Sequence, residues 1–526
     1  MVSVASADFT GNYKHPTSPR IDPAYPSSAR LEGSWRLPED NRVTAKMSMT
    51  AVYPRPDGET QSHARHRKFH SDMPYRIPIG VQGGAWPFKY EITNAPSGAT
   101  IGSEYGDANY GILQWTPSGE TGVQNFKVTV TDQDLNTVTL EWNATLDDDA
   151  FLFIQDGWAG TKTGTKAEPL EDWADWYKGS WTDSTYANKI IVFRGGNYAV
   201  TGDATNESGN CSLNSGVKSP SLIGYPGETP ILDCTTAKIF SRVVGGATNN
   251  EDLTIIGLRF ENGRADVANS HFFWCTGTGF NRHCFAENYF YNMGAGTSGT
   301  DNNGCIFISN DSQAKNYGLI KQNTVDTVTN ASSTNGMYFE AYWMNYWVVE
   351  ENTVKNSNST SGIYLKATTT FISCRGNQMW ENNTGTGISI GYLNASSMAT
   401  PHDHEVCWNR AVISGAANTS TVIFDMVREN GYPGTHYNTY CYRNTFQNGF
   451  DRVRFGGLEN YETEGNIIIS DSVAADHWTA SLRTEPSGRE SIEDTFTGNA
   501  TTDANGVLTG AARTTYLGTK GHEVSA

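Results

Sequence analysis

Residues 362–377 read Gly-Ile-Tyr-Leu-Lys-Ala-Thr-Thr-Thr-Phe-Ile-Ser-Cys-Arg-Gly-Asn, in which an apolar–variable–apolar triplet is followed by an asparagine beside apolar residues. This order recurs through the second half of the chain, in units that begin at residues 304, 336, 362, 387, 421 and 452. The asparagines that match Asn377 lie at positions 323, 352, 409, 444 and 466. Successive units are therefore 25 to 34 residues long, which is the length of one solenoid coil together with a loop.

This repeat predicts a parallel β-helix. One coil cannot bury its own apolar triplet, but stacked coils bury it between them. Asparagines at the same turn of every coil can hydrogen-bond as a ladder, which satisfies their polar groups inside an apolar column. A β-propeller would need four strands per repeat and recurrent signature dipeptides, which the sequence lacks. Cys374, Cys407 and Cys441 each precede one of the asparagines, so we expect them to be stacked interior thiols.

The composition limits the classes of function. A chain of 526 residues is too long for one compact core, and an aromatic content of 12% argues against disorder. The net charge of −18 argues against a nucleic-acid backbone or an anionic membrane surface as the partner. No stretch approaches the roughly 20 apolar residues of a membrane span. The opening residues 1–9 lack the charged and apolar regions of a secretion signal.

Four segments are expected along the chain: an N-terminal arm or linker at 1–48, a β-sandwich at 49–147, the β-helix at 148–470 and a closing segment at 471–526. The second segment contains short runs with period-two alternation, such as Asn125-Phe-Lys-Val-Thr-Val-Thr-Asp132, which favour a sandwich. Its basic run, His63–His70, is expected to be a solvated loop.

Two resemblances support this division. The order Pro87-Phe-Lys-Tyr-Glu-Ile, Gly111-Ile-Leu-Gln-Trp-Thr-Pro and Asn125-Phe-Lys-Val-Thr-Val resembles cadherin-like, putative immunoglobulin modules, which implies a spacer or positioning role. The segments 189–198 and 220–234 resemble the opening coils of the pectate-lyase-like β-helix superfamily. The expected fold is therefore all-β, a right-handed parallel β-helix preceded by an immunoglobulin-like β-sandwich.

The outward face of the triplets is the candidate functional surface. In each triplet the outer residues point inward, whereas the middle residue and the residue after the triplet point outward. The first outward column is Phe307, Tyr338, Tyr364, Ser389, Ile423 and Arg454, and the second is Ser309, Glu340, Lys366, Gly391, Asp425 and Gly456. Aromatic faces beside charged groups suit sugar rings and their carboxylates, so we expect an extended, acidic polysaccharide as the ligand. An ordinary exposed sheet with a Glu340–Lys366 cross-strand ion pair is the structural alternative.

Further residues belong to the same candidate surface. Asp311 and Tyr342 lie two residues beyond the second column, and Tyr392 follows Gly391. The expected catalytic residues are Glu340, Lys366, Asp425 and Asp311. The expected substrate-binding residues are Tyr338, Tyr342, Tyr364, Tyr392, Arg428, Arg454, His402, His404 and His436.

Two mechanisms fit these residues. Hydrolysis needs two carboxylates about 5 to 10 Å apart, which Asp311 and Glu340 on neighbouring coils could provide. Glu340 and Asp425 are three coils apart, roughly 14 Å, which is too far for this role. β-Elimination needs a base and a group that neutralises a uronic carboxylate. Lys366 could be the base, Tyr364, Tyr338 or Tyr342 the acid, and Arg454 or Arg375 the neutralising group. A bound Ca²⁺ could replace the arginine, although no cofactor is required by the sequence.

The segment Pro401-His-Asp-His-Glu405 is expected to be a loop. Alternating His and acidic residues could bind a divalent metal or supply a general base, whereas the structural alternative is a polar loop tip. His436 lies in the next predicted loop on the same side.

Ser361–Asn377 resembles the lysine-containing strand and asparagine turn of β-helix alginate and chondroitin lyases. Those enzymes carry acidic metal ligands shortly before the lysine and an arginine on the next strand. Here the first positions hold Ser and Thr, and the next strand reads Ile388-Ser-Ile-Gly391. The resemblance therefore leaves the choice between hydrolysis and elimination open.

Residues 502–524 resemble the closing segment of solenoid polysaccharide-degrading proteins, including viral tail-spike depolymerases. That resemblance implies a homotrimer, on a phage tail or secreted, and hence an extracellular protein. Three functions remain open: a polysaccharide depolymerase, a non-catalytic carbohydrate-binding adhesin or receptor-binding spike, and a structural solenoid without a glycan ligand.

Overall fold

The computed structural model describes residues 44–55, 64–172, 189–200, 211–213, 221–235, 239–245, 252–263, 271–277, 281–293, 303–308, 315–328, 336–357, 361–366, 369–382, 386–392, 402–413, 422–426, 436–442, 444–447, 452–455, 458–464, 467–470, 490–492 and 495–498. Most of the predicted N-terminal arm therefore lies outside the described residues. No helix in the described part of the chain is long and apolar enough to cross a membrane.

The first part of the chain forms a small β-module of antiparallel strands, with one parallel pair. Its elements are β1 (Thr50–Tyr53), η3 (Arg65–Arg67), β2 (Lys68–Phe69), β3 (Tyr75–Pro78), β4 (Gly80–Gln82), β5 (Lys89–Asn94), β6 (Thr100–Ile101), β7 (Ile112–Trp115), β8 (Val123–Thr131) and β9 (Thr137–Leu146). The strands pair as β1-β4, as β2-β9-β8-β5 and as β3-β7-β6. Alternation in β8 and β9 buries Phe126, Val128, Leu140 and Trp142 between the layers.

The rest of the described chain is a stack of parallel strands in three long sheets. Sheet 1 contains β10 (Phe151–Ile154), which follows η4 (Asp148–Ala150), then β11 (Ile190–Phe193), β14 (Ser221–Gly224), β17 (Thr254–Ile256), β20 (Asn281–Ala286), β23 (Lys315–Lys321), β26 (Met344–Glu350), β29 (Thr370–Arg375), β32 (His402–Cys407), β35 (His436–Tyr442), β38 (Leu458–Glu464) and β40 (Glu490–Ile492).

Sheet 2 contains β12 (Gly196–Ala199), β15 (Pro230–Asp233), β18 (Arg259–Glu261), β21 (Tyr289–Met293), β24 (Thr324–Val328), β27 (Thr353–Ser357), β30 (Gln378–Asn382), β33 (Arg410–Ile413), β36 (Thr445–Gln447), β39 (Ile467–Ser470) and β41 (Thr495–Gly498). Sheet 3 contains β13 (Cys211–Leu213), β16 (Ile239–Gly245), β19 (His271–Gly277), β22 (Asn303–Ile308), β25 (Gly336–Tyr342), β28 (Ser361–Lys366), β31 (Thr386–Tyr392), β34 (Val422–Met426) and β37 (Arg452–Phe455).

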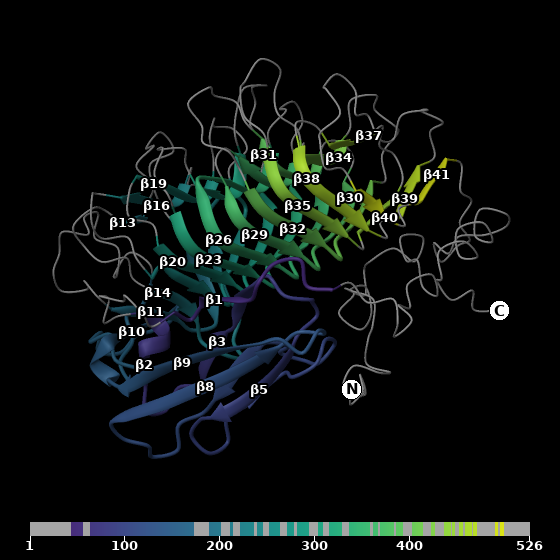
Figure 1. The fold of residues 1–526 in the computed structure, drawn as a ribbon. Coiled ribbons are helices and arrows are strands. Elements are labelled where there is room, and N and C mark those ends of the chain that lie inside the picture. Colours follow the sequence, from purple (N-terminus) through teal and green to yellow (C-terminus); the bar gives the residue numbers. More distant parts are fainter. Residues whose placement is uncertain are drawn as a thin grey trace, which may run out of the picture.

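From β11 to β36, each coil contributes one strand to each sheet, so each strand pairs with the strand three places further along the chain. At the ends of the stack, β10 pairs with β11, β38 with β40 and β39 with β41. Figure 1 shows the resulting solenoid, with the β-module lying along one side of it. The fold class, an all-β right-handed parallel β-helix preceded by an immunoglobulin-like sandwich, is confirmed. β40 and β41, which belong to the predicted closing segment, pair onto sheets 1 and 2.

The asparagine ladder is confirmed where the structure describes it. Asn323 donates its backbone N–H and its side-chain amide to Asn352 Oδ1, both at 3.0 Å, and donates the amide also to the Phe285 carbonyl of the preceding coil at 2.9 Å. The same pattern links Asn352, Asn377, Asn409 and Asn444. The ladder begins one coil earlier than predicted, at Asn288, whereas the predicted Asn466 lies outside the described residues.

The predicted stack of three cysteines is wrong in one member. Cys374 and Cys441 both pair with Val406 and belong to the interior core, but Cys407 pairs with Arg375 and Tyr442 on the other face of sheet 1. The reason is the spacing to the ladder asparagine, which is three residues for Cys374 and Cys441 but two for Cys407. A difference of one residue in a strand reverses the side-chain direction.

The basic run of the module is also not a solvated loop. Arg65 and His66 form part of η3 and are 2% and 1% exposed. Arg65 donates hydrogen bonds to the carbonyls of Lys68 and Pro74, and its guanidinium lies 4.8 Å from the Tyr75 ring centroid. The run is therefore a buried structural element of the module.

Candidate functional site

The outer face of sheet 3 carries a continuous row of residues that the strand register aligns. Phe273 and Cys275 of β19 are buried in the interior core, as are Ile306 and Ile308 of β22, so the positions between them belong to the opposite face. We call this the outer row. From β16 to β37 its members are Arg242, Trp274, Phe307, Glu340, Tyr364, Ser389, Asp425 and Arg454.

The outer row corrects the predicted alignment in two coils. Glu340, rather than Tyr338, pairs with Phe307 and with Tyr364. Asp425, rather than Ile423, pairs with Ser389 and Arg454. The register sets Phe339 and Ala341 level with the buried residues Ile306 and Ile308, and Phe424 level with the buried Ile388, two residues later than the triplets predicted. The outward face is unchanged because strand side chains alternate with a period of two.

Tyr338 has a different position from the one predicted. The pairs on either side of it set it level with Cys305 and Gly362, and both of those residues are buried. Cys305 belongs to the interior core. Tyr338 is therefore not a member of the outer row.

A second, shorter row lies further along β25, β28 and β31, two residues after Glu340 and Tyr364 and three residues after Ser389. Lys366 pairs with Tyr342 on one side and with Tyr392 on the other, across a register shift after Leu365. We call Tyr342, Lys366 and Tyr392 the lysine row. Two tyrosines thus occupy the strand positions next to the lysine, each about 4.8 Å away in the backbone. Glu340 and Lys366 are not directly opposite each other but are diagonal neighbours, about 7 to 8 Å apart in the backbone.

The register also separates the two described acids. Glu340 and Asp425 lie in the same row but three strands apart, a backbone separation of about 14 Å. This separation exceeds the carboxylate spacing that glycoside hydrolysis uses. Asp311, which the sequence offered as the closer partner of Glu340, lies outside the described residues, as does Arg428.

Arg242 and Trp274 extend the outer row beyond the residues that sequence reasoning selected. Trp274 is half-buried, and its ring lies 5.7 Å from that of His271. The repeat pattern missed this coil, in which His271 is level with Gly304 of the next unit and Cys275 is level with Ile308. The complete row crosses eight strands, a backbone length of about 34 Å.

The predicted His-acid loop is a strand. His402–Cys407 form β32 in the middle of sheet 1, and the strand alternation divides the cluster. His402 is half-buried with its Nδ1 2.6 Å from the Asp403 carboxylate, whereas His404 is buried with its Nε2 2.8 Å from Thr369 Oγ1. His436, the first residue of β35, is also in sheet 1 and not in sheet 3. The three histidines are therefore not part of the outer row or the lysine row.

Among the residues that the structure describes, no three His, Cys, Asp or Glu side chains lie close enough together to hold a metal ion.

A ladder of half-buried aromatic rings lies where sheet 3 turns into sheet 1. The rings of Tyr317 and Tyr346 stack with centroids 5.1 Å apart, and those of Tyr346 and Phe371 stack at 4.5 Å with an interplanar angle of 3°. The guanidinium of Arg55 covers the free face of Tyr317 at 3.8 Å, and His402 packs edge-on against Phe371. Because the ring faces cover one another, this ladder stabilises the turn and leaves no face for a sugar.

Arg375, one of the two predicted neutralising groups, is fully buried between the β-helix and the module. It makes ion pairs with Glu350 at 2.8 Å and with Glu405 at 2.9 Å. Burial alone raises the pKa of Glu350, but Lys321 and Arg375 more than offset it and hold that pKa below its usual range. Burial also raises the pKa of Glu405, and Arg375 offsets that effect only in part. Arg375 is therefore not available to a ligand on sheet 3.

The comparisons with known proteins come from both sequence and structure. Residues 60–145 match the family model of the putative Ig domain. The β-module at the start of the described chain is therefore immunoglobulin-like. A search of curated proteins finds no match.

Three similar solved structures are polysaccharide-degrading enzymes. A rhamnogalacturonan lyase is 13% identical with a TM-score of 0.45, over 69% of this chain and 95% of that one. A family 28 exopolygalacturonase of Yersinia enterocolitica is 8% identical with a TM-score of 0.38, over 80% and 97% of the two chains. The catalytic domain of a GH87 α-1,3-glucanase, in complex with nigerose, is 9% identical with a TM-score of 0.30, over 79% and 86%. At these identities the likeness concerns the fold alone.

Proposed function

We propose that this protein is a depolymerase that binds an extended, acidic polysaccharide along the outer row and cleaves it by β-elimination. The observation that carries the proposal is the lysine row, because Lys366 has a tyrosine at the adjacent position on each side. A lysine and a tyrosine so close together can serve as base and acid on one sugar unit. The wide separation of Glu340 and Asp425 disfavours the hydrolytic alternative.

The outer row supplies the features that a sugar polymer requires. Its aromatic members offer ring faces for stacking, and its arginines, Arg242 and Arg454, can pair with carboxylates along the chain. Arg454 is about 14 Å from Tyr364 in the backbone, so it suits a neighbouring sugar unit better than the one that reacts.

The test uses the full chain and a panel of uronate-containing polymers. Elimination produces an unsaturated sugar that absorbs in the ultraviolet, together with new reducing ends. The expected result is a rise in both signals, which Lys366→Met abolishes and Lys127→Met leaves unchanged. Lys127 is a matched control because it is an exposed strand lysine of the module, 3.3 Å from Glu141.

Two other outcomes would replace the proposal. New reducing ends without the ultraviolet signal would show hydrolysis, in which carboxylates rather than Lys366 would be the catalytic groups. Tight binding without either signal would support a non-catalytic carbohydrate-binding adhesin or spike, the second candidate. That candidate is favoured by the length of the outer row, which exceeds what one reacting sugar unit needs.

The predicted homotrimer and the extracellular setting, on a phage tail or after secretion, remain proposals. Sedimentation of the full chain at several concentrations tests the first of them. A single species of three times the 57.6 kDa chain mass is expected, and a monomer at all concentrations would contradict it.

A further inference from the structure

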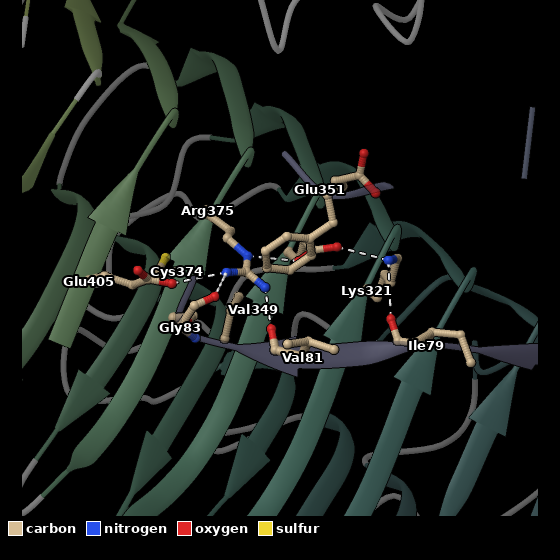
Figure 2. A network of polar contacts seen from close by, with 12 residues as sticks. Ile79, Val81, Gly83, Lys321, Val349, Glu351, Cys374, Arg375 and Glu405 are labelled. Carbon is tan, nitrogen blue, oxygen red and sulfur yellow. Dashed lines mark hydrogen bonds and ion pairs between the residues drawn. The ribbon is translucent and has the colours of Figure 1, made fainter. Parts of the chain in front are cut away.

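The immunoglobulin-like module is joined to the β-helix by a buried network of charges (Figure 2). Lys321 at the end of β23, Glu350 at the end of β26 and Arg375 at the end of β29 occupy equivalent positions in three successive rungs of sheet 1. Lys321 and Arg375 both pair with Glu350 at 2.8 Å. Arg375 also pairs with Glu405 of the next rung, whose carboxylate accepts a hydrogen bond from the Tyr442 hydroxyl.

The module completes this network with its own backbone. The module segment that contains β4 crosses the rungs of sheet 1. Its carbonyls at Ile79, Val81 and Gly83 accept hydrogen bonds from the charged side chains of the network. Lys321 Nζ donates to Ile79 at 3.2 Å, whereas Arg375 donates to both Val81 and Gly83. Because carbonyls two residues apart in a strand face the same side, one short strand reaches successive rungs.

Apolar contacts seal the same interface. The Phe88 ring lies 4.5 Å from the Arg375 guanidinium, and Trp86 packs near Trp408 with ring centroids 6.5 Å apart. Module residues and the outer face of sheet 1 form one hydrophobic cluster. The buried charges would lack these carbonyl partners without the module, and an unpaired buried charge is strongly destabilising. The module is therefore a fixed part of the β-helix.

The coils that the module holds are the coils that carry the candidate site. β25, with Glu340 and Tyr342, is separated from β26 by the single residue Trp343. β28, with Tyr364 and Lys366, is followed by β29, which ends at Arg375. A slip of one residue between these coils in sheet 1 would also change which residues are level in sheet 3.

We propose that Arg375 is a positioning residue, through which the module fixes the register of β25 and β28 and so keeps Lys366 beside Tyr342. This inference rests on the proposed function for its catalytic meaning, although the structural coupling can be measured without a substrate. In this proposal the module packs on sheet 1 and stabilises the register of the site strands in sheet 3 of the same coils.

Hydrogen exchange of the full chain, measured by mass spectrometry without ligand, tests the coupling. Arg375→Met is expected to give at least severalfold faster exchange in peptides of β25 and β28, which belong to sheet 3, whereas Arg375 lies in sheet 1. Arg375→Lys, which retains the charge, should give a smaller increase. Arg259→Met is the matched control, because Arg259 pairs with Glu261 and stacks on Tyr289 in sheet 2, away from the module.

Faster exchange confined to β26, β29 and the module would overturn the proposal. Should Arg375→Met fail to fold, Ser373→Ala provides a milder change, which removes no charge. Ser373 Oγ accepts a hydrogen bond from the Gly83 N–H of the module at 2.9 Å and also hydrogen-bonds the Glu405 carboxylate of the network. This variant should raise exchange in the same two strands to a smaller extent, and unchanged exchange there would equally overturn the proposal.

Kinetics separates this inference from the proposed function. If a substrate is cleaved, Arg375→Met should lower kcat more than it changes KM, measured per folded molecule, and Arg375→Lys should restore part of the loss. A variant that changes only the folded fraction would leave both constants unchanged and count against positioning. If no polymer is cleaved, the proposed function fails, whereas the exchange result still decides the coupling.

Discussion

At the scale of single residues, Lys366 is the side chain on which the elimination mechanism depends. Its neighbours in the lysine row are Tyr342 and Tyr392, and replacing the base removes the group that takes the proton. Lys366→Met is expected to lower kcat by about 10² to 10⁴-fold. The measurement is the rate at which unsaturated product appears, and Lys127→Met should retain the parent rate.

The two tyrosines can be distinguished in the same assay. Tyr342→Phe removes a hydroxyl while keeping the ring, and so tests proton donation apart from stacking. If Tyr342 is the acid, this variant loses activity and Tyr392→Phe does not. Equal, small effects of both variants would show that neither hydroxyl donates the proton.

Glu350 allows a prediction of stability against pH. Its folded-state pKa lies below the ordinary value, so its stabilising contribution is present above about pH 4.3 and is lost as the pH falls through the folded-state pKa. Glu350→Gln leaves Lys321 and Arg375 without their shared partner, which is expected to cost about 3 to 5 kcal/mol at neutral pH. Urea unfolding should show this deficit at neutral pH and a smaller one in acid, whereas Glu141→Gln, at an exposed position, should show none at either.

Single residues also mark where sequence reasoning succeeded and failed. The alternation on either side of Tyr364 correctly predicted that Ile363 and Leu365 are buried, because the period of a strand is a local property. The alignment between coils is not local. Met337 and Phe339 are both apolar, so the sequence could not tell that Phe339 is the residue level with Ile306. Tyr338 was misplaced for this reason.

At the scale of elements, the asparagine ladder is the feature that the sequence predicted best. Every described rung binds the next through the same atoms, so the expectation of a polar column within an apolar core was sound. Asn377→Ala would leave buried donors and acceptors of its neighbours without partners, at about 1 to 3 kcal/mol for each. Thermal or urea unfolding measures the loss. Asn356→Ala, at an exposed position of β27 where the Asn356 side chain donates a hydrogen bond to Asp326, is the control and should cost much less.

The turns of the coils could not be predicted from the sequence. The residue before each ladder asparagine from Asn288 to Asn409 has a positive φ, yet the series is Glu287, Gln322, Glu351, Gly376 and Trp408. Only Gly376 carries the usual signature of such a backbone. The hydrogen bonds of the adjacent asparagines hold the other residues in this conformation, and those bonds exist only after the coils have stacked. The His-acid segment was mistaken for a loop because its strand contains a similar irregularity at Asp403, whose φ is +56°.

The outer row predicts how cleavage depends on substrate length. Trp274 lies three strands from Tyr364, a backbone distance of about 14 Å, and so would contact only a polymer that extends past the reacting unit. Trp274→Ala is expected to raise KM for long chains and to leave the KM for the shortest cleaved oligosaccharides unchanged. A uniform effect on both would remove Trp274 from the binding surface.

At the scale of the whole molecule, the net charge of −18 opposes the approach of a polyanion. The arginines and lysine of the two rows attract it only at short range. Added salt screens the long-range repulsion first, over a Debye length of about 10 Å at 0.1 M. The association rate with an acidic polymer should therefore rise from low to moderate ionic strength. Stopped-flow measurement decides this, and a steady fall would show that the local positive charge dominates.

The sequence predicted two domains but not how they are joined. The module was expected to be a spacer, because nothing in the local pattern of Ile79–Gly83 indicates that its carbonyls will meet Lys321 and Arg375 more than 200 residues later. Arg375 was taken for a ligand-binding group for the same reason. Buried charges whose partners are distant in sequence cannot be distinguished from exposed ones by composition alone.

Each ladder asparagine connects three consecutive coils, since it accepts from the coil before it and donates to the coil after it. In a growing chain, the asparagine of the last folded coil therefore has a backbone N–H and a side-chain amide without an acceptor. The asparagine of the next coil supplies that acceptor when it docks. Growth of the solenoid thus has a built-in direction, and its assembly can keep pace with translation one coil at a time.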